Sequence, residues 1–410
     1  MPDALMQMKR MPRDFFFRVC FLLVFFLSNA LLSRCASSRQ QPGSFQPRAD
    51  GEWKTSTFAE AGFDEVALRT CLNEILSRDA NFHSLIVERS GRLVVEAYRS
   101  GRDRPFNHLY GSTFPFTQSE FDARTLHDVR SSTKSVIGIL YGIALAKKLV
   151  PQPDESVVAN YPGLENISDD KKAITYEHLL TMSSGLEWNE WVPFFVSDET
   201  PLLWKKDLAQ YFFNRPLTSH PGSTFNYSGG STAVLADTLS RALHSSSGKT
   251  LEEFARSELF EKLGITQWEW VLDFRDRPMP HAGLRLRPRD MAKLGRLMLN
   301  GGVFHGIQIV PGSWVEASIK KRIQTGVRVF SGTNRELGYG YQWWTGETEV
   351  KGRMVEWKAA IGNGGQQIIL IPAFDMSIVM TAGDYGSPDM IHTEATFMDA
   401  ILQTFVETSN

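Results

Sequence analysis

A Ser-x-x-Lys pair stands directly before a long apolar stretch in the first half of the sequence. Ser131 and Lys134 are three residues apart, and the apolar stretch covers the eleven residues 136–146. Eleven residues are too few to cross a bilayer, and a helix that is apolar on every side belongs in a protein core. The sequence therefore predicts a buried helix whose first turn carries a serine and a lysine on one face, because residues three apart are neighbours on a helix.

This pairing favours nucleophilic catalysis. A serine becomes a nucleophile when a base takes its proton, and Lys134 can be this base if burial and the positive helix end lower its pKa. The free N–H groups at the same helix end can hold a developing oxyanion. The spacing recurs at 246–249 and 318–321, where no buried helix follows. The alternative is that the Ser131 hydroxyl only caps the helix.

Two further segments could complete such a site. Tyr227 lies in a Gly/Ser-rich turn before a predicted helix at 233–243. A tyrosine beside a lysine ammonium can ionise below its usual pKa and pass a proton to the leaving group. The stretch 361–366, Ile-Gly-Asn-Gly-Gly-Gln, enters a predicted strand, and its glycines permit the close backbone approach that a second oxyanion donor needs. The alternatives are a tyrosine at the edge of the core and an ordinary Gly-rich turn.

Other catalytic patterns have little support. The sequence contains no His-Glu-x-x-His, no cysteine pair and no Gly-x-Gly-x-x-Gly before a helix, and the nearest nucleophile elbow, at 229–233, lacks its final glycine. We therefore expect no metal and no cofactor. The net charge of −2, without a long basic run, argues against a nucleic-acid partner.

The order of predicted elements defines the fold class. Strand-like runs lie near both ends of the 410 residues, and helix-like runs lie between them. We predict an α+β fold, with an antiparallel sheet built from both chain ends, flanking helices and a mostly helical inserted domain. The expected sheet domain covers 60–126 and 283–410, and the expected helical domain, which carries the nucleophile, covers 127–282. The expected strands are 84–88, 93–98, 339–344, 366–371 and 376–381.

The first 35 residues are predicted to be a secretory signal peptide. Lys9, Arg10 and Arg13 precede an apolar run at 19–27 and a small-residue site at 28–30. The alternative is a retained membrane anchor, whereas lipidation of Cys35 is less favoured. Residues 36–59 are expected to be a linker. We expect export to the bacterial periplasm or the extracellular space, with membrane contact only through this N-terminal segment.

The three candidate segments together resemble the serine β-lactamase and penicillin-binding-protein superfamily over roughly 60–408. The chain looks most like the class C-related branch, with its β-lactamase-like esterases and 6-aminohexanoate-dimer hydrolases. Ser131-x-x-Lys134 is similar to the first family motif. Tyr227 matches the tyrosine of the Tyr-x-Asn motif, whereas Gly229 stands where asparagine is usual. Residues 360–366 occupy the place of the Lys/His-Thr-Gly strand and lack its cation. Further similar segments are 178–186, 289–290 and 339–344.

The resemblance implies a serine hydrolase that cleaves esters or amides of small molecules through an acyl-enzyme. It implies Ser131 as nucleophile, Lys134 as general base and Tyr227 as proton relay. The backbone N–H groups of Ser131 and Asn363 would then hold the oxyanion, and Gly364 and Gln366 would contact the substrate. The alternatives are a D-alanyl-D-alanine peptidase, a β-lactamase or, less favoured, a non-catalytic module that binds cell-wall peptide. The missing cation argues against efficient β-lactam hydrolysis.

An aromatic segment at 186–204 follows one of these family-like stretches. It contains Trp188, Trp191 and Trp204. These side chains could line a cleft, as the corresponding region does in relatives, or form core under a loop. We expect Trp188 to form a cleft wall and to favour substrates with an apolar part.

Overall fold

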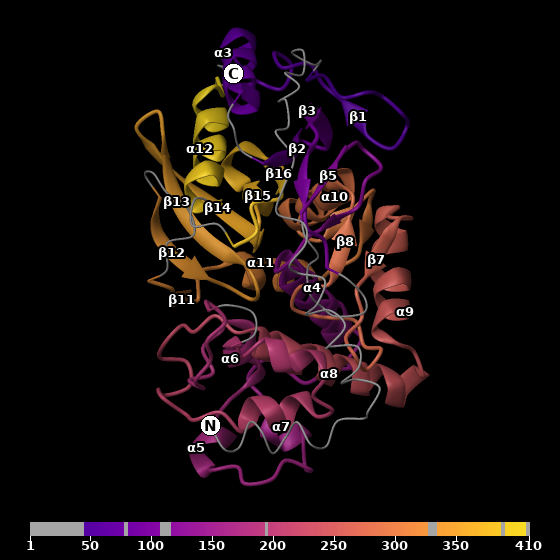
Figure 1. Cartoon of the computed structure of the whole chain (residues 1–410), viewed down its shortest axis with the longest axis vertical. Coiled ribbons are helices and arrows are strands. Elements are labelled where there is room, and N and C mark those ends of the chain that lie inside the picture. Colours follow the sequence, from indigo (N-terminus) through magenta and orange to yellow (C-terminus); the bar gives the residue numbers. More distant parts are fainter. Residues whose placement is uncertain are drawn as a thin grey trace, which may run out of the picture. The chain divides into compact units, whose positions relative to one another are not determined.

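The computed structural model describes residues 45–77, 81–106, 116–192, 196–326, 334–386 and 390–406. Residues 42–410 form one compact unit. Within the described residues, the largest sheet has nine strands in the order β1-β3-β2-β16-β15-β14-β13-β12-β11 (Figure 1). These strands are β1 (Lys54–Thr55), β2 (Phe82–Arg89), β3 (Arg92–Tyr98), β11 (Ile323–Gln324), β12 (Arg335–Tyr339), β13 (Trp344–Val350), β14 (Arg353–Gly362), β15 (Gln366–Ile371) and β16 (Met376–Ala382).

The two ends of the chain meet in the middle of this sheet. β2 pairs antiparallel with β16, so that Ile86 lies opposite Val379. The remaining pairs are also antiparallel, except that β1 runs parallel to β3. The predicted α+β fold, with an antiparallel sheet built from both chain ends, is confirmed.

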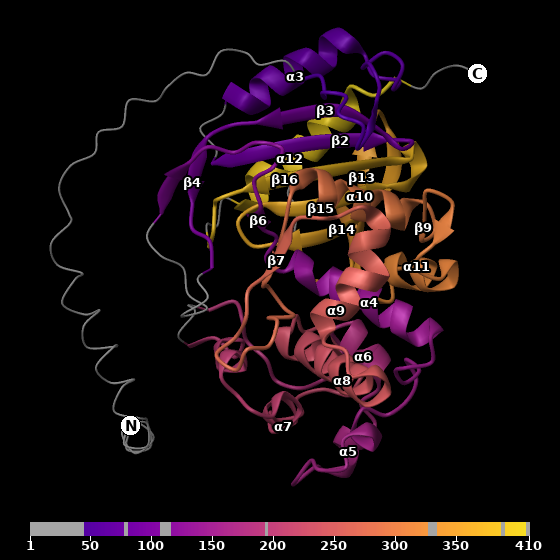
Figure 2. The ribbon, with the colours of Figure 1, turned by 90° about the vertical axis from the view of Figure 1, so that its right-hand side faces the viewer.

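Helices cover both faces of the sheet. α3 (Glu65–Ser77) and α12 (Met390–Gln403) lie on one face, and α4 (Ser132–Ala146) and α10 (Pro288–Leu299) lie on the other (Figure 2). Side chains of a strand alternate between faces. Thus Val87 and Ile369 join the core under α3 and α12, whereas Ile86 and Leu370 join the core under α4 and α10.

A helical region lies beyond α4, on the side away from α3 and α12 (Figure 2). Its helix α8 packs against α4 and shares one hydrophobic core with the sheet, through residues such as Leu235 and Ile86. The helices of this region are α5 (Asp169–Lys172), α6 (Tyr176–Leu180), α7 (Leu208–Phe213), α8 (Gly229–Ser247) and α9 (Leu251–Ala255). The remaining elements are α11 (Gly312–Ile319), β4 (Gly101–Asp103), β5 (Thr117–Ser119), β6 (His127–Asp128), β7 (Trp268–Trp270), β8 (Leu284–Leu286), β9 (Val303–Phe304), β10 (Ile307–Gln308) and the short helices η2 (Val158–Asn160), η4 (Thr200–Leu203), η5 (Arg256–Phe260), η6 (Glu261–Leu263) and η7 (Pro372–Phe374).

Helix α4 is buried along almost its whole length, as its apolar sequence predicts. Two glycines let it approach its neighbours closely. A Cβ at Gly142 would lie 2.1 Å from the Trp314 ring, and a Cβ at Gly138 would lie 3.2 Å from the Tyr341 carbonyl oxygen. The serine and lysine of its first turn are therefore attached to a helix that is fixed on all sides.

The stretch 339–344 is not the single strand that the sequence predicts. β12 ends at Tyr339 and β13 begins at Trp344, and the turn between them contains Gln342 with a φ of 64°. The buried Gln342 amide donates to the carbonyl oxygens of Leu179 and Leu180, each at 3.1 Å, and accepts from the Thr232 hydroxyl at 2.8 Å. These hydrogen bonds connect the turn to α6 and α8. Because they require the turn conformation, the strand is interrupted here.

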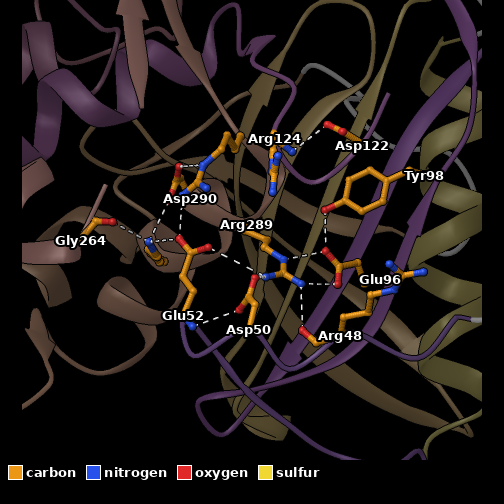
Figure 3. Close-up of polar contacts among 12 residues, drawn as sticks. Arg48, Asp50, Glu52, Glu96, Tyr98, Asp122, Arg124, Gly264, Arg289 and Asp290 are labelled. Atoms are coloured by element: carbon orange, nitrogen blue, oxygen red, sulfur yellow. Dashed lines mark hydrogen bonds and ion pairs between the residues drawn. The ribbon is translucent and has the colours of Figure 1, made fainter. Parts of the chain in front are cut away.

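The predicted linker at 36–59 is wrong for the residues that the structure describes. β1 pairs with β3, and the preceding turn is held by ion pairs (Figure 3). The Glu52 carboxylate accepts from Lys293 at 2.6 Å, and Arg289 binds both Asp50 and the Glu96 carboxylate, the latter at 2.6 Å. The sequence segment 289–290 thus anchors the N-terminal strand. The sequence could not predict these ion pairs, because Asp50 and Glu52 lie in a polar stretch and their partners are far away along the chain.

The predicted signal peptide, residues 1–35, lies outside the described residues and stays a prediction. Among the residues that the structure describes, no helix combines the length and the apolar character that a membrane span requires. Cys71 is buried on α3, as expected for a core thiol.

Candidate active site

Ser131 and Lys134 meet at the N-terminus of α4. Ser131 precedes the helix, and its hydroxyl makes no capping hydrogen bond, contrary to the capping alternative. The Lys134 ammonium donates to Ser131 Oγ at 3.0 Å and to the carbonyl oxygen of His281 at 3.2 Å. Lys134 is buried and Ser131 is half-buried. The predicted serine–lysine contact is therefore present.

The turn before Ser131 has a strained backbone. Arg130 has a φ of 49°, an uncommon conformation for a residue with a side chain. Its guanidinium lies between the rings of Phe106, at 3.7 Å, and Tyr385, at 4.2 Å, and donates to the Arg104 carbonyl oxygen at 2.7 Å. These contacts keep the chain in the conformation that directs the Ser131 side chain toward Lys134.

The end of β14 lies against the Ser131 backbone. A Cβ at Gly362 would be 2.3 Å from the Val129 carbonyl oxygen and 3.1 Å from Ser131 N, so glycine is required for this approach. Asn363 follows at once in the turn to β15, and its side chain accepts from Gly386 N at 2.8 Å. The structure thus brings the two predicted oxyanion segments, Ser131 and Asn363, side by side.

Gly364 in the turn after β14 and Gln366 at the start of β15 are enclosed. Gly364 has a φ of 91°, and a Cβ there would lie 2.3 Å from the Tyr385 ring. Gln366 is fully buried, and its side-chain amide binds the Ala382 carbonyl oxygen. The predicted substrate contact of the Gln366 side chain is therefore corrected to a structural role, because that side chain points into the sheet core. The buried Gly364 supports the loop beside Asn363.

Tyr227 completes the cluster, as predicted. Its ring lies 4.8 Å from the Lys134 ammonium, whose positive charge favours ionisation of the phenol. Burial raises the pKa of Tyr227 and outweighs the opposing effect of Lys134. The phenol is therefore held in its protonated form in the resting site.

Lys134 differs from the expectation that its pKa is lowered. Burial acts in that direction, but the attraction of Glu190 and further contributions from Tyr227 and Glu199 hold the pKa of Lys134 above its ordinary value. The carboxylates lie 3.6 Å and 3.5 Å from the ammonium, respectively. The sequence did not reveal this pair, because no spacing rule relates residues 190 and 199 to a lysine at 134.

The aromatic segment is divided between core and surface. Trp188 is only 5% exposed and packs against Phe212, so the predicted cleft wall at Trp188 is wrong. Its indole N–H donates to Glu190 at 2.8 Å, which requires it to point inward. Trp191 is instead 64% exposed, and its ring lies 5.6 Å from that of Tyr227. Trp191 is thus the tryptophan that faces the solvent side of the cluster.

A large antiparallel sheet flanked by helices is the architecture of the β-lactamase and penicillin-binding-protein fold. The family model described as "Beta-lactamase" matches residues 83–400, and the chain belongs to this family.

Three relatives illustrate the range of this family. The chain is 24% identical to the 6-aminohexanoate-dimer hydrolase of Paenarthrobacter ureafaciens, over 75% of this chain and 74% of the relative. It is 29% identical to the lovastatin esterase of Penicillium rubens over 36% of this chain and 37% of the relative. The octameric penicillin-binding protein homologue from Pyrococcus abyssi has a similar fold, with a TM-score of 0.57 and 19% identity over 83% of this chain and 77% of that protein.

Proposed function

We propose that the protein is a serine hydrolase that cleaves ester or amide bonds of small molecules through an acyl-enzyme intermediate. The observation that carries this proposal is the contact between Ser131 Oγ and the Lys134 ammonium, 3.0 Å long, with the Tyr227 ring 4.8 Å from the same ammonium. A binding module has no need of all three groups. The proximity of Gly362 to Ser131 N supports an oxyanion site beside them.

The proposed reaction has two halves. Ser131 Oγ adds to the substrate carbonyl carbon while its proton passes to Lys134, and the carbonyl oxygen becomes an oxyanion held by the N–H groups of Ser131 and Asn363. Tyr227 then passes a proton to the leaving alcohol or amine, and the acyl group stays on Ser131. In the second half, water attacks the acyl carbon and gives a proton to Tyr227, and the bond from the acyl carbon to Ser131 Oγ breaks as Lys134 returns a proton to that oxygen, which releases the acid.

The substrate class follows from the residues beside the serine. Ala360 is buried at the position where β-lactam-hydrolysing relatives are expected to carry a cation, so this position offers no charge to a β-lactam carboxylate. The names of the relatives include an esterase and a hydrolase of an amide-linked dimer. Esters and linear amides are therefore favoured over β-lactams.

The direct test is hydrolysis of a short p-nitrophenyl ester by wild type and Ser131→Ala. We expect Ser131→Ala to lower kcat by a factor of about 10³ or more with the fold retained, because the residual rate comes only from binding and the oxyanion site. Ser246→Ala is the matched control, since Ser246 begins another Ser-x-x-Lys sequence and lies on the exposed end of α8. Equal activity of Ser131→Ala and wild type would rule out the proposal.

A further inference from the structure

Two carboxylates lie behind the catalytic lysine. Glu190 Oε1 is 3.6 Å and Glu199 Oε1 is 3.5 Å from the Lys134 ammonium, on loops that precede and follow the short gap in the described chain at 193–195. The same ammonium donates to Ser131 and to the His281 carbonyl oxygen. Lys134 therefore connects the nucleophile directly to a pair of buried acids.

Glu190 is fixed by its own hydrogen bonds. Its Oε2 accepts from the Trp188 indole at 2.8 Å and from the Gly229 backbone N–H at 2.6 Å. These donors direct Oε1 toward Lys134. The side chain of Glu190 is 7% exposed and that of Glu199 is 24% exposed, so neither charge is well solvated.

The absence of a side chain at 229 makes room for the pair. A Cβ at Gly229 would lie 2.5 Å from Glu199 Oε1 and 3.2 Å from Glu190 Oε2. Any larger residue at this position would displace the carboxylates from Lys134. Position 229 is thus a glycine where the family usually has asparagine, and the carboxylates of Glu190 and Glu199 lie beside it.

One ammonium cannot neutralise two carboxylates in a poorly solvated site. Burial and the neighbouring charge of Glu199 raise the pKa of Glu190. The Lys134 ammonium donates a hydrogen bond to Glu199 Oε1 at 3.5 Å. Burial and the Lys134 charge lower the pKa of His281 to about 3, so its ring adds no charge at neutral pH. The other titratable or charged groups near the two carboxylates are Lys134, Tyr227 and Tyr339. Asp273 acts on the neighbouring His281 ring.

We infer that Glu199 is the proton acceptor behind Lys134: it takes the proton that Lys134 must lose in order to deprotonate Ser131. This inference rests on the proposed acyl-enzyme function. It explains how Lys134, which is an ammonium at rest, can act as the base for Ser131.

The proton transfers balance without any further reactant. The Ser131 Oγ bond to the carbonyl carbon forms, the carbonyl electron pair moves onto its oxygen, and the Ser131 proton moves to Lys134. Lys134 gives one of its protons to the Glu199 carboxylate, so that it stays an ammonium. When the tetrahedral intermediate collapses, the proton returns through Lys134 and Tyr227 to the leaving group. Glu199 acts through Lys134 and is a positioning residue, not one that contacts the substrate.

The rival role is that of a simple counter-ion, and the two roles predict opposite results. A counter-ion only holds the proton on Lys134, so its loss should free the base and leave kcat at pH 7 unchanged or higher. An acceptor is needed for the transfer, so Glu199→Gln should lower the acylation rate at pH 7 by at least about tenfold with KM unchanged. The measurement is stopped-flow acylation by a p-nitrophenyl ester across pH, corrected for buffer hydrolysis.

The wild-type pH profile gives an independent readout. If Glu199 accepts the proton, acylation reaches its plateau below about pH 9, because Lys134 then does not have to lose a proton to water. If Lys134 must lose its proton to water, the rate still rises above about pH 10, beyond the ordinary lysine pKa. That result would overturn the inference even if the variants failed to fold.

Two further variants complete the design. Gly229→Ala places a methyl group against Glu199 and should reproduce the loss seen with Glu199→Gln, with thermal unfolding as the check on folding. Glu187→Gln, an exposed glutamate of the same loop, is the matched control and should retain wild-type rates. Rates of Glu199→Gln and Gly229→Ala within twofold of wild type would overturn the inference.

The experiment also separates this inference from the proposed function. A wild-type enzyme that shows no acylation burst and no ester hydrolysis refutes the serine hydrolase itself. A wild-type enzyme that acylates at Ser131, together with a Glu199→Gln variant that acylates equally fast, refutes only the role of Glu199.

Discussion

Trp191 and Trp188 differ by three positions but have opposite environments. Trp188 is in the core, with its N–H on Glu190, whereas Trp191 exposes 64% of its surface beside the Tyr227 ring. An exposed aromatic ring next to Tyr227 could offer apolar surface to the acyl or alcohol part of a substrate. We therefore propose that Trp191, and not Trp188, gives the preference for apolar substrates.

We predict that Trp191→Ala raises KM for a long-chain p-nitrophenyl ester by about tenfold, equivalent to ~1.4 kcal/mol of lost apolar contact. KM for the acetyl ester should change little, and kcat should be retained for both, because binding rather than transition-state contact is lost. Steady-state kinetics with the two esters measure this. Trp204→Ala is the control, since Trp204 is an exposed tryptophan of the same segment. An equal change for both esters would contradict the assignment.

The sequence was sufficient to predict that Ser131, Lys134 and Tyr227 lie close together, because each is part of a short motif with a recognisable spacing. It was not sufficient for Glu190, Glu199 or the inward position of Trp188. These three share one irregular segment, where no periodicity indicates which side chains point inward. Their orientation depends on Gly229 and Lys134, which are distant in the sequence and come close only in the folded chain.

Among the secondary-structure elements, α4 is the central one against which several others pack. It packs against β14, β15, α8 and α11, and its glycines face a ring and a backbone turn. Its burial followed directly from eleven consecutive apolar or small residues. The break between β12 and β13 could not be predicted, because it depends on the amide of Gln342 reaching two carbonyl groups on α6.

Gly142→Ala should destabilise the protein by about 1–3 kcal/mol, the usual cost of overpacking a core. The added methyl group would overlap the Trp314 ring, 2.1 Å from the Cβ position, and both neighbours are buried. Urea unfolding of the purified protein measures the change in free energy. Gly163→Ala provides the control, because no atom lies within 4 Å of its Cβ position. Equal stability of the two variants would show that α4 can shift without cost.

At the scale of the whole molecule, buried histidines couple stability to pH. His83 and His127 are buried and both stack on Phe121, with ring distances of 3.8 Å and 4.8 Å to it. Burial lowers the pKa of His83 to about 4 and that of His127 to about 3. Burial acts in the opposite sense on Glu88, where it raises the pKa to about 7.

We predict that the free energy of unfolding falls as the pH drops from about 6.5 toward 4. In this range the unfolded chain binds a proton on each histidine and the folded chain does not, so each contributes up to about 1.4 kcal/mol per pH unit. Glu88 offsets part of this above pH 4.5, because its folded form holds a proton that the unfolded form has lost.

Urea unfolding at several pH values measures this slope. His127→Asn should reduce the slope by about one proton, whatever its effect on the absolute stability. His244→Asn, on the exposed end of α8, should leave the slope unchanged. Identical slopes in wild type and His127→Asn would mean that His127 accepts a proton in the folded protein as readily as in the unfolded chain.

The proposed reaction of this protein requires an acyl-enzyme at Ser131. The most direct measurement is mass spectrometry of the protein after exposure to a fluorophosphonate, followed by peptide mapping. The account predicts one covalent adduct, on Ser131, that is absent from Ser131→Ala and present in Ser246→Ala. A protein that hydrolyses esters but gives no adduct, or gives one on another residue, would contradict it.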